Sequence, residues 1–460
     1  MTNASLEPTC PTSAAGSPFG VRPFIPGPMR EPPVGTSAIS RFRQLRQTYP
    51  AKVFEQLLEE QRIGRFRFLI LNDPESIRHV LVENAKSYGK SPFLRRLLEP
   101  ALGQGLVTSE GELWNRNRRL MAPSFAHRNL NRFAPIIAQT TSQFLSRWDG
   151  VGNGAIIDMA EEMSELTLSS IAQTMFGEDD ECVLRDITKI VGRYQEVVGF
   201  GIADFLGLPN WIPRLSTIRG RKVVRHLDKV VDQLIKRSHG STDRLIDLLV
   251  GGTDKAGFRL NRQQIRDEIV TILTVGHETT AQALTWTWYL LSEHPEVEHK
   301  FMAEINAVLN GRPPTYEDLE KLAYTKAIVQ ESMRLFPPAP TFSRICLTDD
   351  VILGRQIPRG TIVMIAPWVL HRHRRFWDDP DNFKPERFYA AKEKPQAYLP
   401  FGIGPRVCIG AGFAMMETVI ILSQIGQRYQ FKLVPGHPVV PVARIALRPR
   451  YGMKMSLTRR

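Results

Sequence analysis

The sequence Phe401-Gly402-Ile403-Gly404-Pro405-Arg406-Val407-Cys408-Ile409-Gly410 places three glycines around a single cysteine, and a helical pattern begins directly after it. Glycine lets the backbone turn sharply and lets a large flat group approach it closely. Backbone amides at the start of a helix favour a thiolate over a thiol. A thiolate held in this way can act as an axial ligand to haem iron, and the nearby Arg406 can pair with a haem propionate.

The segment matches the pattern FGxGxRxCxG and resembles the haem-ligand loop of the cytochromes P450. This resemblance implies that Cys408 is the metal ligand and that Phe401 and Arg406 contact the cofactor, haem b (iron protoporphyrin IX). The alternative is a buried cysteine in a glycine-rich turn. The motifs that follow favour the haem-ligand interpretation.

A second motif, Val275-Gly276-His277-Glu278-Thr279-Thr280, lies midway along the longest expected helix, residues 261–292. An acid beside a hydroxyl suits proton delivery, because each group can donate, accept or hold water. Taken alone, the motif also fits a helix with a solvated polar face. Beside the cysteine loop it resembles the oxygen-activation segment of the family, which implies catalytic roles for Glu278 and Thr279.

Two further features resemble cofactor contacts of the family. Trp114 and Arg118 are four residues apart, which places them on one face of a helix. An aromatic–cation pair at the surface is the alternative for this spacing. The resemblance implies that Trp114 and Arg118 contact the haem propionates. It implies the same for Arg344, which follows Pro337-Pro338, although a plain surface arginine fits that position almost as well.

Glu331 and Arg334 are three residues apart inside an expected helix, so their side chains can pair on one face. Phe383, Pro385 and Arg387 follow about 50 residues later and resemble the family's FxPERF segment. The resemblance implies a buried charge network of Glu331, Arg334 and Arg387 with a structural role.

The periodicity of the chain predicts a mainly α protein with minor β-sheet. Residues 1–35 contain eight prolines and are expected to be a flexible lead-in, and residues 36–460 a single haem domain. The resemblance implies a cytochrome P450 fold in which haem is buried between the long central helix and the cysteine loop. The sequence pattern also predicts a helix over Ser37–Gln61 and a strand over Arg65–Leu71.

Composition limits the class of protein further. The chain has 460 residues, 42% hydrophobic and 23% charged, which excludes wholesale disorder and low-complexity repeats. Its four cysteines lack zinc-site spacing and are too few for a disulfide scaffold, so we expect a reducing compartment and a cytoplasmic location. The sequence contains no run of 18 apolar residues, so we expect no transmembrane anchor.

The formal charge of +13 favours acidic partners or anionic surfaces. No basic-aromatic module is present, so we do not expect nucleic acid as a partner. No flavin- or NAD-binding fingerprint follows the haem region, so electrons are expected from a separate ferredoxin or flavodoxin-type protein with its NAD(P)H reductase. Arginines near Trp114, at positions 116, 119, 128 and 132, are expected to face that partner.

The sequence therefore predicts a monooxygenase that inserts one oxygen atom from O2 into a small apolar substrate. A fatty acid is the first hypothesis for the substrate, from the branch of the family that the chain resembles, and a terpenoid or other polycyclic lipid is the second. Segments 91–108, 193–215 and 337–342 are expected to line the substrate pocket. The alternatives are a peroxide-driven or rearranging haem-thiolate enzyme and a non-catalytic haem sensor.

Overall fold

A computed structural model describes the chain at residues 49, 51–63, 66–177, 228–229, 231–232, 245–253, 257–389, 391, 393–443 and 446–460. The expected lead-in, residues 1–35, and the expected pocket segment 193–215 lie outside these ranges.

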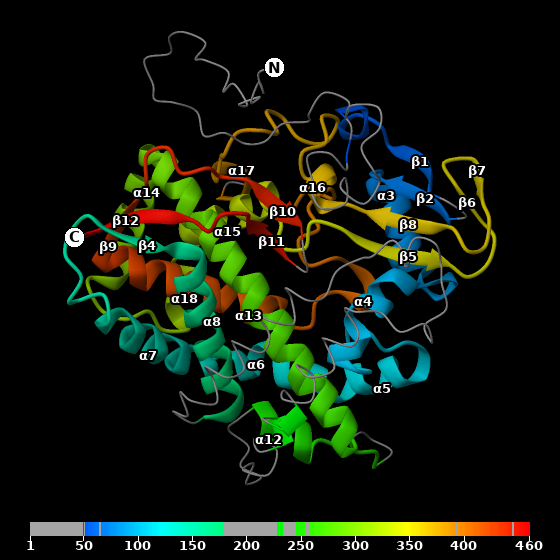
Figure 1. Cartoon of the computed structure of the whole chain (residues 1–460), viewed down its shortest axis with the longest axis horizontal. Helices are drawn as coiled ribbons and strands as arrows, with labels where there is room; N and C mark the ends of the chain where they lie inside the picture. Colours follow the sequence, from blue (N-terminus) through cyan, green and yellow to red (C-terminus); the bar gives the residue numbers. More distant parts are fainter. Residues whose placement is uncertain are drawn as a thin grey trace, which may run out of the picture.

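The described chain is mostly helical with small sheets, which confirms the predicted fold class (Figure 1). Its α-helices are α3 (Pro74–Arg78), α4 (Pro92–Leu102), α5 (Gly111–Met121), α6 (His127–Leu130), α7 (Phe133–Ser146), α8 (Met159–Phe176), α12 (Leu245–Gly251), α13 (Arg262–Glu293), α14 (Pro295–Leu309), α15 (Ala323–Leu335), α16 (Pro367–Leu370), α17 (Glu386–Tyr389) and α18 (Ala411–Arg428). Short helical turns are η1 (Ala51–Phe54), η2 (His79–Glu83), η3 (Ala85–Ser87), η4 (Ala122–Phe125), η5 (Glu317–Glu320) and η6 (Gly404–Arg406).

The strands form four small sheets. They are β1 (Leu58–Ile63), β2 (Phe66–Leu71), β3 (Tyr88–Lys90), β4 (Ala155–Asp158), β5 (Phe342–Cys346), β6 (Asp350–Ile352), β7 (Arg355–Ile357), β8 (Ile362–Ile365), β9 (Tyr429–Leu433), β10 (Pro441–Ala443), β11 (Leu447–Pro449) and β12 (Lys454–Arg459). The largest sheet has the order β1-β2-β8-β5-β3, in which β2 and β8 are parallel and the other neighbours are antiparallel. This sheet therefore joins the start of the described chain to a segment almost 300 residues later.

Helix α13 crosses the middle of the molecule, between the largest sheet and the helices α7, α8 and α18 (Figure 1). Asn261 caps it with a capping box: the Asn261 side chain accepts from the Gln264 amide, and the Gln264 side chain accepts from the Asn261 amide. The helix continues for 32 residues without proline and packs on α8, α15 and α18. Most of its residues are buried, but Val275, Gly276 and Thr279 in its middle are half-buried.

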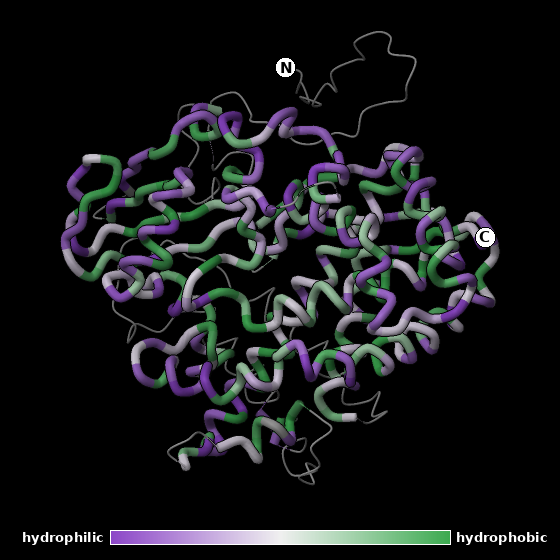
Figure 2. The backbone as a smooth tube through the Cα atoms, turned by 180° about the vertical axis from the view of Figure 1, so that it is seen from behind, coloured by the Kyte–Doolittle hydropathy of each residue, from purple (hydrophilic) through white to green (hydrophobic). Residues whose placement is uncertain are grey.

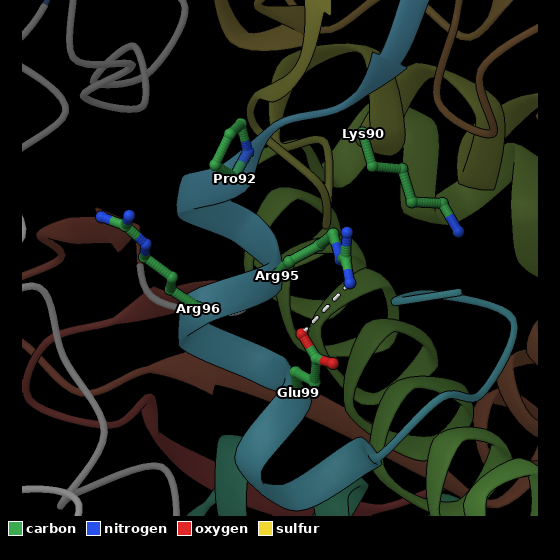
Figure 3. A pocket seen from close by; sticks show the side chains of 5 residues that line it. All are labelled: Lys90, Pro92, Arg95, Arg96 and Glu99. Carbon is green, nitrogen blue, oxygen red and sulfur yellow. Dashed lines mark ion pairs between the residues drawn. The ribbon is translucent and has the colours of Figure 1, made fainter. Parts of the chain in front are cut away.

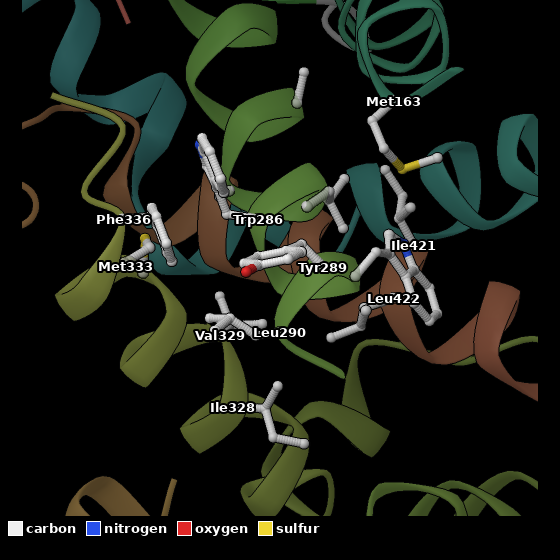
Figure 4. Packing of buried hydrophobic residues seen from close by; sticks show 14 of the residues in the cluster. Met163, Trp286, Tyr289, Leu290, Ile328, Val329, Met333, Phe336, Ile421 and Leu422 are labelled. Carbon is white, nitrogen blue, oxygen red and sulfur yellow. The ribbon is translucent and has the colours of Figure 1, made fainter. Parts of the chain in front are cut away.

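The central core lies where α13 meets α15 and α18. The Trp286 ring stacks on Phe336 at 4.2 Å between ring centroids, and its indole N–H donates to the Leu447 carbonyl (2.9 Å). Tyr289 packs edge-on against both rings (Figure 4). Seen from behind, hydrophobic segments follow the helices and strands through the middle, and many outer turns are hydrophilic (Figure 2). The rigid core around α13 holds the ends of α15 and α18 in fixed places.

The expected helix over Ser37–Gln61 is wrong in its described part. Residues 51–54 form the short turn η1, and Leu58–Ile63 is a strand that pairs antiparallel with β2. The chain between Leu57 and Asn72 forms a hairpin, closed by the Asn72 amide donating to the Leu57 carbonyl (2.8 Å). The strand expected over Arg65–Leu71 is found as β2. Pairing with β2 explains why Leu58–Ile63 is a strand and not part of a helix.

None of the helices in the described ranges is both long enough and apolar enough to cross a bilayer.

Candidate functional site

The loop before α18 is shaped by its glycines. Gly402 and Gly404 have positive φ angles of 67° and 77°, where side chains with a Cβ are strained. A Cβ at Gly404 would also collide with the backbone carbonyl of Leu81. The Cys408 amide donates to the Phe401 carbonyl (2.9 Å), which closes the loop. Phe401 itself packs, partly buried, against the central core.

Cys408 combines exposure with enclosure. Its side chain is solvent-accessible, yet burial among protein atoms raises the pKa of its thiol. Hydrogen bonding from the Gly410 amide and the charge of Arg118 lower that pKa, as expected for a cysteine at the start of a helix, but burial has the larger effect. The thiol is therefore surrounded by protein atoms but not fully covered by them. Such a thiol suits a ligand to a buried metal, whose positive charge would favour the thiolate.

Three cations surround the Trp114 ring on α5. The guanidinium of Arg406 lies 5.1 Å from the ring centroid, that of Arg118 5.7 Å, and the Nζ of Lys90 5.9 Å. Arg118 is also close enough to Cys408 for their charges to interact. The structure therefore brings together Trp114, Arg118, Arg406 and Cys408, all of which the sequence singled out, and adds Lys90.

Lys90 and Arg344 extend this cation cluster. They are direct partners in the antiparallel pairing of β3 with β5. Burial and the charge of Arg406 lower the pKa of both groups, to about 7 for Lys90 and about 10 for Arg344. The Lys90 ammonium donates to the carbonyls of Leu106 (2.7 Å) and Ser109 (2.6 Å). Arg344 is therefore half-buried within the cation cluster, and its contact with a cofactor stays a prediction.

Glu110 is a residue of the site that sequence reasoning missed. Its carboxylate accepts two hydrogen bonds from the Arg406 guanidinium, with Nη1 2.8 Å from Oε1, and a third from the Lys90 amide. These donors, more than offsetting its burial, hold the pKa of Glu110 below its usual value. Arg406, expected to pair with a propionate, is therefore already held by a carboxylate of the protein. Its guanidinium keeps further N–H groups for another anion.

The polar motif of α13 has a defined set of contacts. The Thr279 hydroxyl donates to the Val275 carbonyl (2.9 Å), and the Thr280 hydroxyl donates to the Gly276 carbonyl (3.1 Å). A Cβ at Gly276 would come within 2.5 Å of Cδ1 of Ile171 on α8, so the end of the Ile171 side chain would have to move.

Glu278 is buried, with 1% of its surface exposed, and both of its carboxylate oxygens accept hydrogen bonds from the guanidinium of Arg448 on β11. The solvated-face alternative for this motif is therefore wrong. A carboxylate in such an ion pair can pass on a proton only by loosening its hold on Arg448. The sequence offered no signal for this partner, which is 170 residues away.

The expected charge network of Glu331, Arg334 and Arg387 is present. Nε of Arg334 lies 2.7 Å from Glu331, Nε of Arg387 lies 3.3 Å from the same carboxylate, and the Glu331 and Arg334 side chains are fully buried. Arg334 also donates to the carbonyls of His371, Pro380 and Asn382. This network fixes α15 to the segment that leads to the cysteine loop.

The described ranges hold no group of three or more His, Cys, Asp or Glu side chains placed to bind a metal ion. His371 accepts from the Leu399 amide (2.8 Å), and burial lowers the pKa of its imidazole to about 3. The two histidines at 371 and 373 thus serve local packing.

A pocket of about 270 Å³ lies at the start of α4, within the expected substrate segment 91–108. Figure 3 shows its lining: Lys90, Pro92, Arg95, Arg96 and Glu99, with Arg95 paired to Glu99 at 3.5 Å. This lining is mostly charged, whereas Leu98 and Leu106, two apolar residues of that segment, are buried in a hydrophobic cluster with α8 and α13. The expectation of an apolar lining therefore does not hold for this pocket.

Comparisons with known proteins agree with this arrangement. A model of the cytochrome P450 family matches residues 35–455. The chain is 32% identical to cyclooctatin synthase of Streptomyces melanosporofaciens (85% of this chain, 86% of the relative) and 31% identical to pentalenene oxygenase of Streptomyces avermitilis (87% and 89%). It is also 31% identical to Protein LUTEIN DEFICIENT 5, chloroplastic, of Arabidopsis thaliana (86% and 71%). The chain therefore belongs to the cytochrome P450 family of haem-iron proteins and is a cytochrome P450 monooxygenase.

Proposed function

We propose that the protein binds haem b with Cys408 as the iron ligand and oxidises a terpenoid or similar apolar substrate with O2 and electrons from a separate protein. The observation that carries the proposal is the enclosed but accessible thiol of Cys408 beside a cluster of buried and half-buried cations. A haem brings one iron for the thiol and two anionic propionates for the cations. Lys90, Arg118, Arg344 and Arg406 supply four positive charges, and Glu110 is the one nearby carboxylate that bears on both Lys90 and Arg344.

When bound, the haem supplies the chemistry of oxygen activation and transfer to carbon. The protein's own residues have three tasks. Cys408 would provide a soft anionic ligand to the iron. Trp114, Arg118 and Arg344 hold the propionate side, with Lys90 added from the structure. Thr279 holds a proton at its hydroxyl. Glu278 would supply protons to Thr279 when its ion pair with Arg448 loosens.

The names of three relatives bear on the substrate. Cyclooctatin synthase and pentalenene oxygenase act on terpenoids, as does a third relative named cyclooctat-9-en-7-ol 5-monooxygenase. These relatives favour the terpenoid hypothesis over the fatty-acid hypothesis. They do not identify the substrate of this chain, so the proposal is limited to that class.

The electron donor is proposed to be a ferredoxin or flavodoxin-type protein that docks near α5 and α6. Arg119, Arg128 and Arg132 are exposed there, whereas Arg116 stacks on Phe258 at 3.8 Å and is less available. Steering by these exposed charges would act mainly on the association rate and would weaken with salt.

A spectral titration of the ferric holoprotein tests the proposal. Terpenoids and fatty acids are added separately while the Soret band is followed, and compounds that shift the spin state are then incubated with a ferredoxin system and analysed for product. A shift and an oxygenated product with terpenoids alone supports the proposed class. Product with peroxide and none with the ferredoxin system would favour the peroxide-driven alternative. Cys408→Ala is the control, because it should remove the thiolate spectrum.

A further inference from the structure

Three consecutive charged residues lie buried near the start of α13. Arg266, Asp267 and Glu268 expose only 7%, 3% and 0% of their surfaces. Consecutive side chains on an α-helix point about 100° apart, so these three cover more than half of its circumference. Buried charged groups need hydrogen-bond partners, and Arg266 donates to the Ala101 carbonyl at the end of α4 (2.9 Å). The start of α13 is therefore enclosed by other parts of the protein.

The backbone between α4 and α5 supplies partners for the two acids. The Gln104 amide donates to the Asp267 carboxylate (2.7 Å). The Leu106 amide donates to one oxygen of Glu268 (3.0 Å), and the Asn117 side chain on α5 donates to the other (2.9 Å). Glu268 therefore joins three parts of the fold: α13, α5 and the segment that precedes α5.

Leu106 is held from two directions by opposite charges. Its amide donates to Glu268, and its carbonyl accepts from the Lys90 ammonium on β3 (2.7 Å). The same ammonium donates to the Ser109 carbonyl (2.6 Å). Hydrogen bonds to ionised groups are roughly twice as strong as those between neutral groups. Side chains of α13 and β3 together thus fix the position of Leu106.

Gly105 lets the segment lie directly against α13. A Cβ at this position would lie 2.8 Å from the Asp267 carbonyl oxygen and still closer to the Thr271 hydroxyl. The Asp267 carbonyl belongs to the helix backbone and cannot turn aside. A side chain at position 105 would therefore push the segment away from the helix.

Residues 103–109 also bond to one another and form a compact turn. The Ser109 amide donates to the Gly105 carbonyl (2.8 Å), and the Thr108 hydroxyl donates to the Gly103 carbonyl (2.6 Å). Val107, between these bonds, is half-buried. Because the turn is bonded within itself, it can keep its shape while its place relative to α13 is set by side chains outside it.

We propose that Glu268 is a positioning residue that holds the 103–109 turn against α13, opposite Lys90 on the same residue of the turn, and thereby limits how fast ligands enter and leave the substrate space. The inference rests on the proposed function, since segment 91–108 is expected to line that space. Glu268 touches neither substrate nor reacting atoms in this scheme. It acts through the Leu106 backbone.

Hydrogen exchange of the holoprotein, followed by mass spectrometry on peptides that cover residues 103–109, tests the attachment. Glu268→Leu removes both acceptors at similar volume, and we expect exchange there to quicken roughly 10- to 100-fold. Peptides of α18 should not change. A turn that stays as protected in Glu268→Leu as in the natural sequence overturns the proposal, even in a protein that makes product.

Glu268→Gln separates the hydrogen bonds from the mere presence of a buried group. Its amide oxygen can accept from Leu106, and its NH2 group can donate to Oδ1 of Asn117, which has no partner among the described residues. Exchange in Glu268→Gln should therefore stay close to natural. Exchange as fast as in Glu268→Leu would contradict the hydrogen-bonding role.

Stopped-flow binding of phenylimidazole, which binds ferric haem iron through nitrogen, tests ligand entry. Binding and release should both be faster in Glu268→Leu and near natural in Glu268→Gln. Gly105→Ala keeps every charged group and displaces the turn, so it should act like Glu268→Leu. Gly150→Ala is its control, because a Cβ at Gly150 meets open space. Natural rates in both Glu268→Leu and Gly105→Ala would overturn the proposed control of entry, whereas a natural protein that binds no phenylimidazole would count against the haem site itself.

Discussion

Lys90 and Arg344 stand directly opposite each other where β3 pairs antiparallel with β5. Like charges at directly opposed positions destabilise a sheet, and here Arg406 adds a third positive charge nearby. The arrangement makes physical sense when an anion lies against these side chains. Glu110 meets part of this need, and the two propionates of a haem would meet the rest.

Replacing Lys90 by Met should weaken haem retention. A hydrogen bond between charged groups contributes about 1.5–3 kcal/mol, so we expect a loss of affinity of roughly 10- to 100-fold. Transfer of haem from the holoprotein to an acceptor protein measures this loss. Arg62→Met is the control, since Arg62 on β1 is exposed and pairs with Glu60. Equal haem loss in both variants would contradict the role of Lys90.

Haem retention should also depend on pH through Lys90. In the protein without haem, burial lowers the pKa of Lys90 from 10.5 to about 7, so the fold disfavours the charged ammonium. Burial of Lys90 therefore destabilises the fold increasingly as pH falls from 10.5 towards 7. Propionate binding restores the charge and takes up a proton. Haem affinity should therefore decline as pH rises above about 7, and this decline should be absent in Lys90→Met. A pH dependence that is unchanged in the variant would refute the assignment.

The cysteine loop should depend on Glu110 for its attachment to α5. Glu110→Gln removes a charged acceptor from Arg406, and we expect the holoprotein to lose about 1–3 kcal/mol in urea unfolding. Since the pKa of Glu110 is lowered in the fold, its contribution is present above pH 4.5 and is lost as pH falls below it. Glu112→Gln, on the exposed face of α5, should have almost no effect. Equal losses of unfolding free energy in the two variants would show that the Glu110–Arg406 pair does not hold the cysteine loop to α5.

The buried network behind the loop gives a larger effect. Glu331→Gln leaves Arg334 without its buried counter-charge, which typically costs about 3–5 kcal/mol. The same unfolding experiment with Asp381→Asn, whose pair with Arg374 is partly exposed, should show about 0–1 kcal/mol. Similar values for both variants would show that the Glu331 network is not the stronger contact.

Local patterns in the sequence were enough to predict the long helix that carries Glu278 and Thr279. The helix expected over 261–292 is α13, Arg262–Glu293, because its cap and its uninterrupted apolar run are local signals. The side-chain pairs that complete the site could not be predicted, because their members are far apart in the sequence. Glu110 meets Arg406 across 296 positions, and Glu278 meets Arg448 across 170. Lys90 meets Arg344 only because β3 and β5 are neighbours in a sheet whose order does not follow the chain.

The ion pair of Glu278 with Arg448 gives Glu278 two possible roles: it can relay protons, or it can anchor α13 on β11. If Glu278 relays protons, Glu278→Gln should slow product formation and increase its solvent isotope effect, with proton transfer by a positioned acid contributing about 10²–10⁴-fold to rate. Arg448→Met keeps Glu278 but removes its counter-charge. Because Glu278 is buried, we expect the free energy of unfolding to fall by roughly 3 kcal/mol or more. Measuring both properties in both variants is therefore decisive. A Glu278→Gln protein that makes product at the natural rate and isotope effect, yet unfolds more easily, would assign Glu278 to anchoring α13 on β11 and leave Thr279 as the proton-holding group of the proposed mechanism.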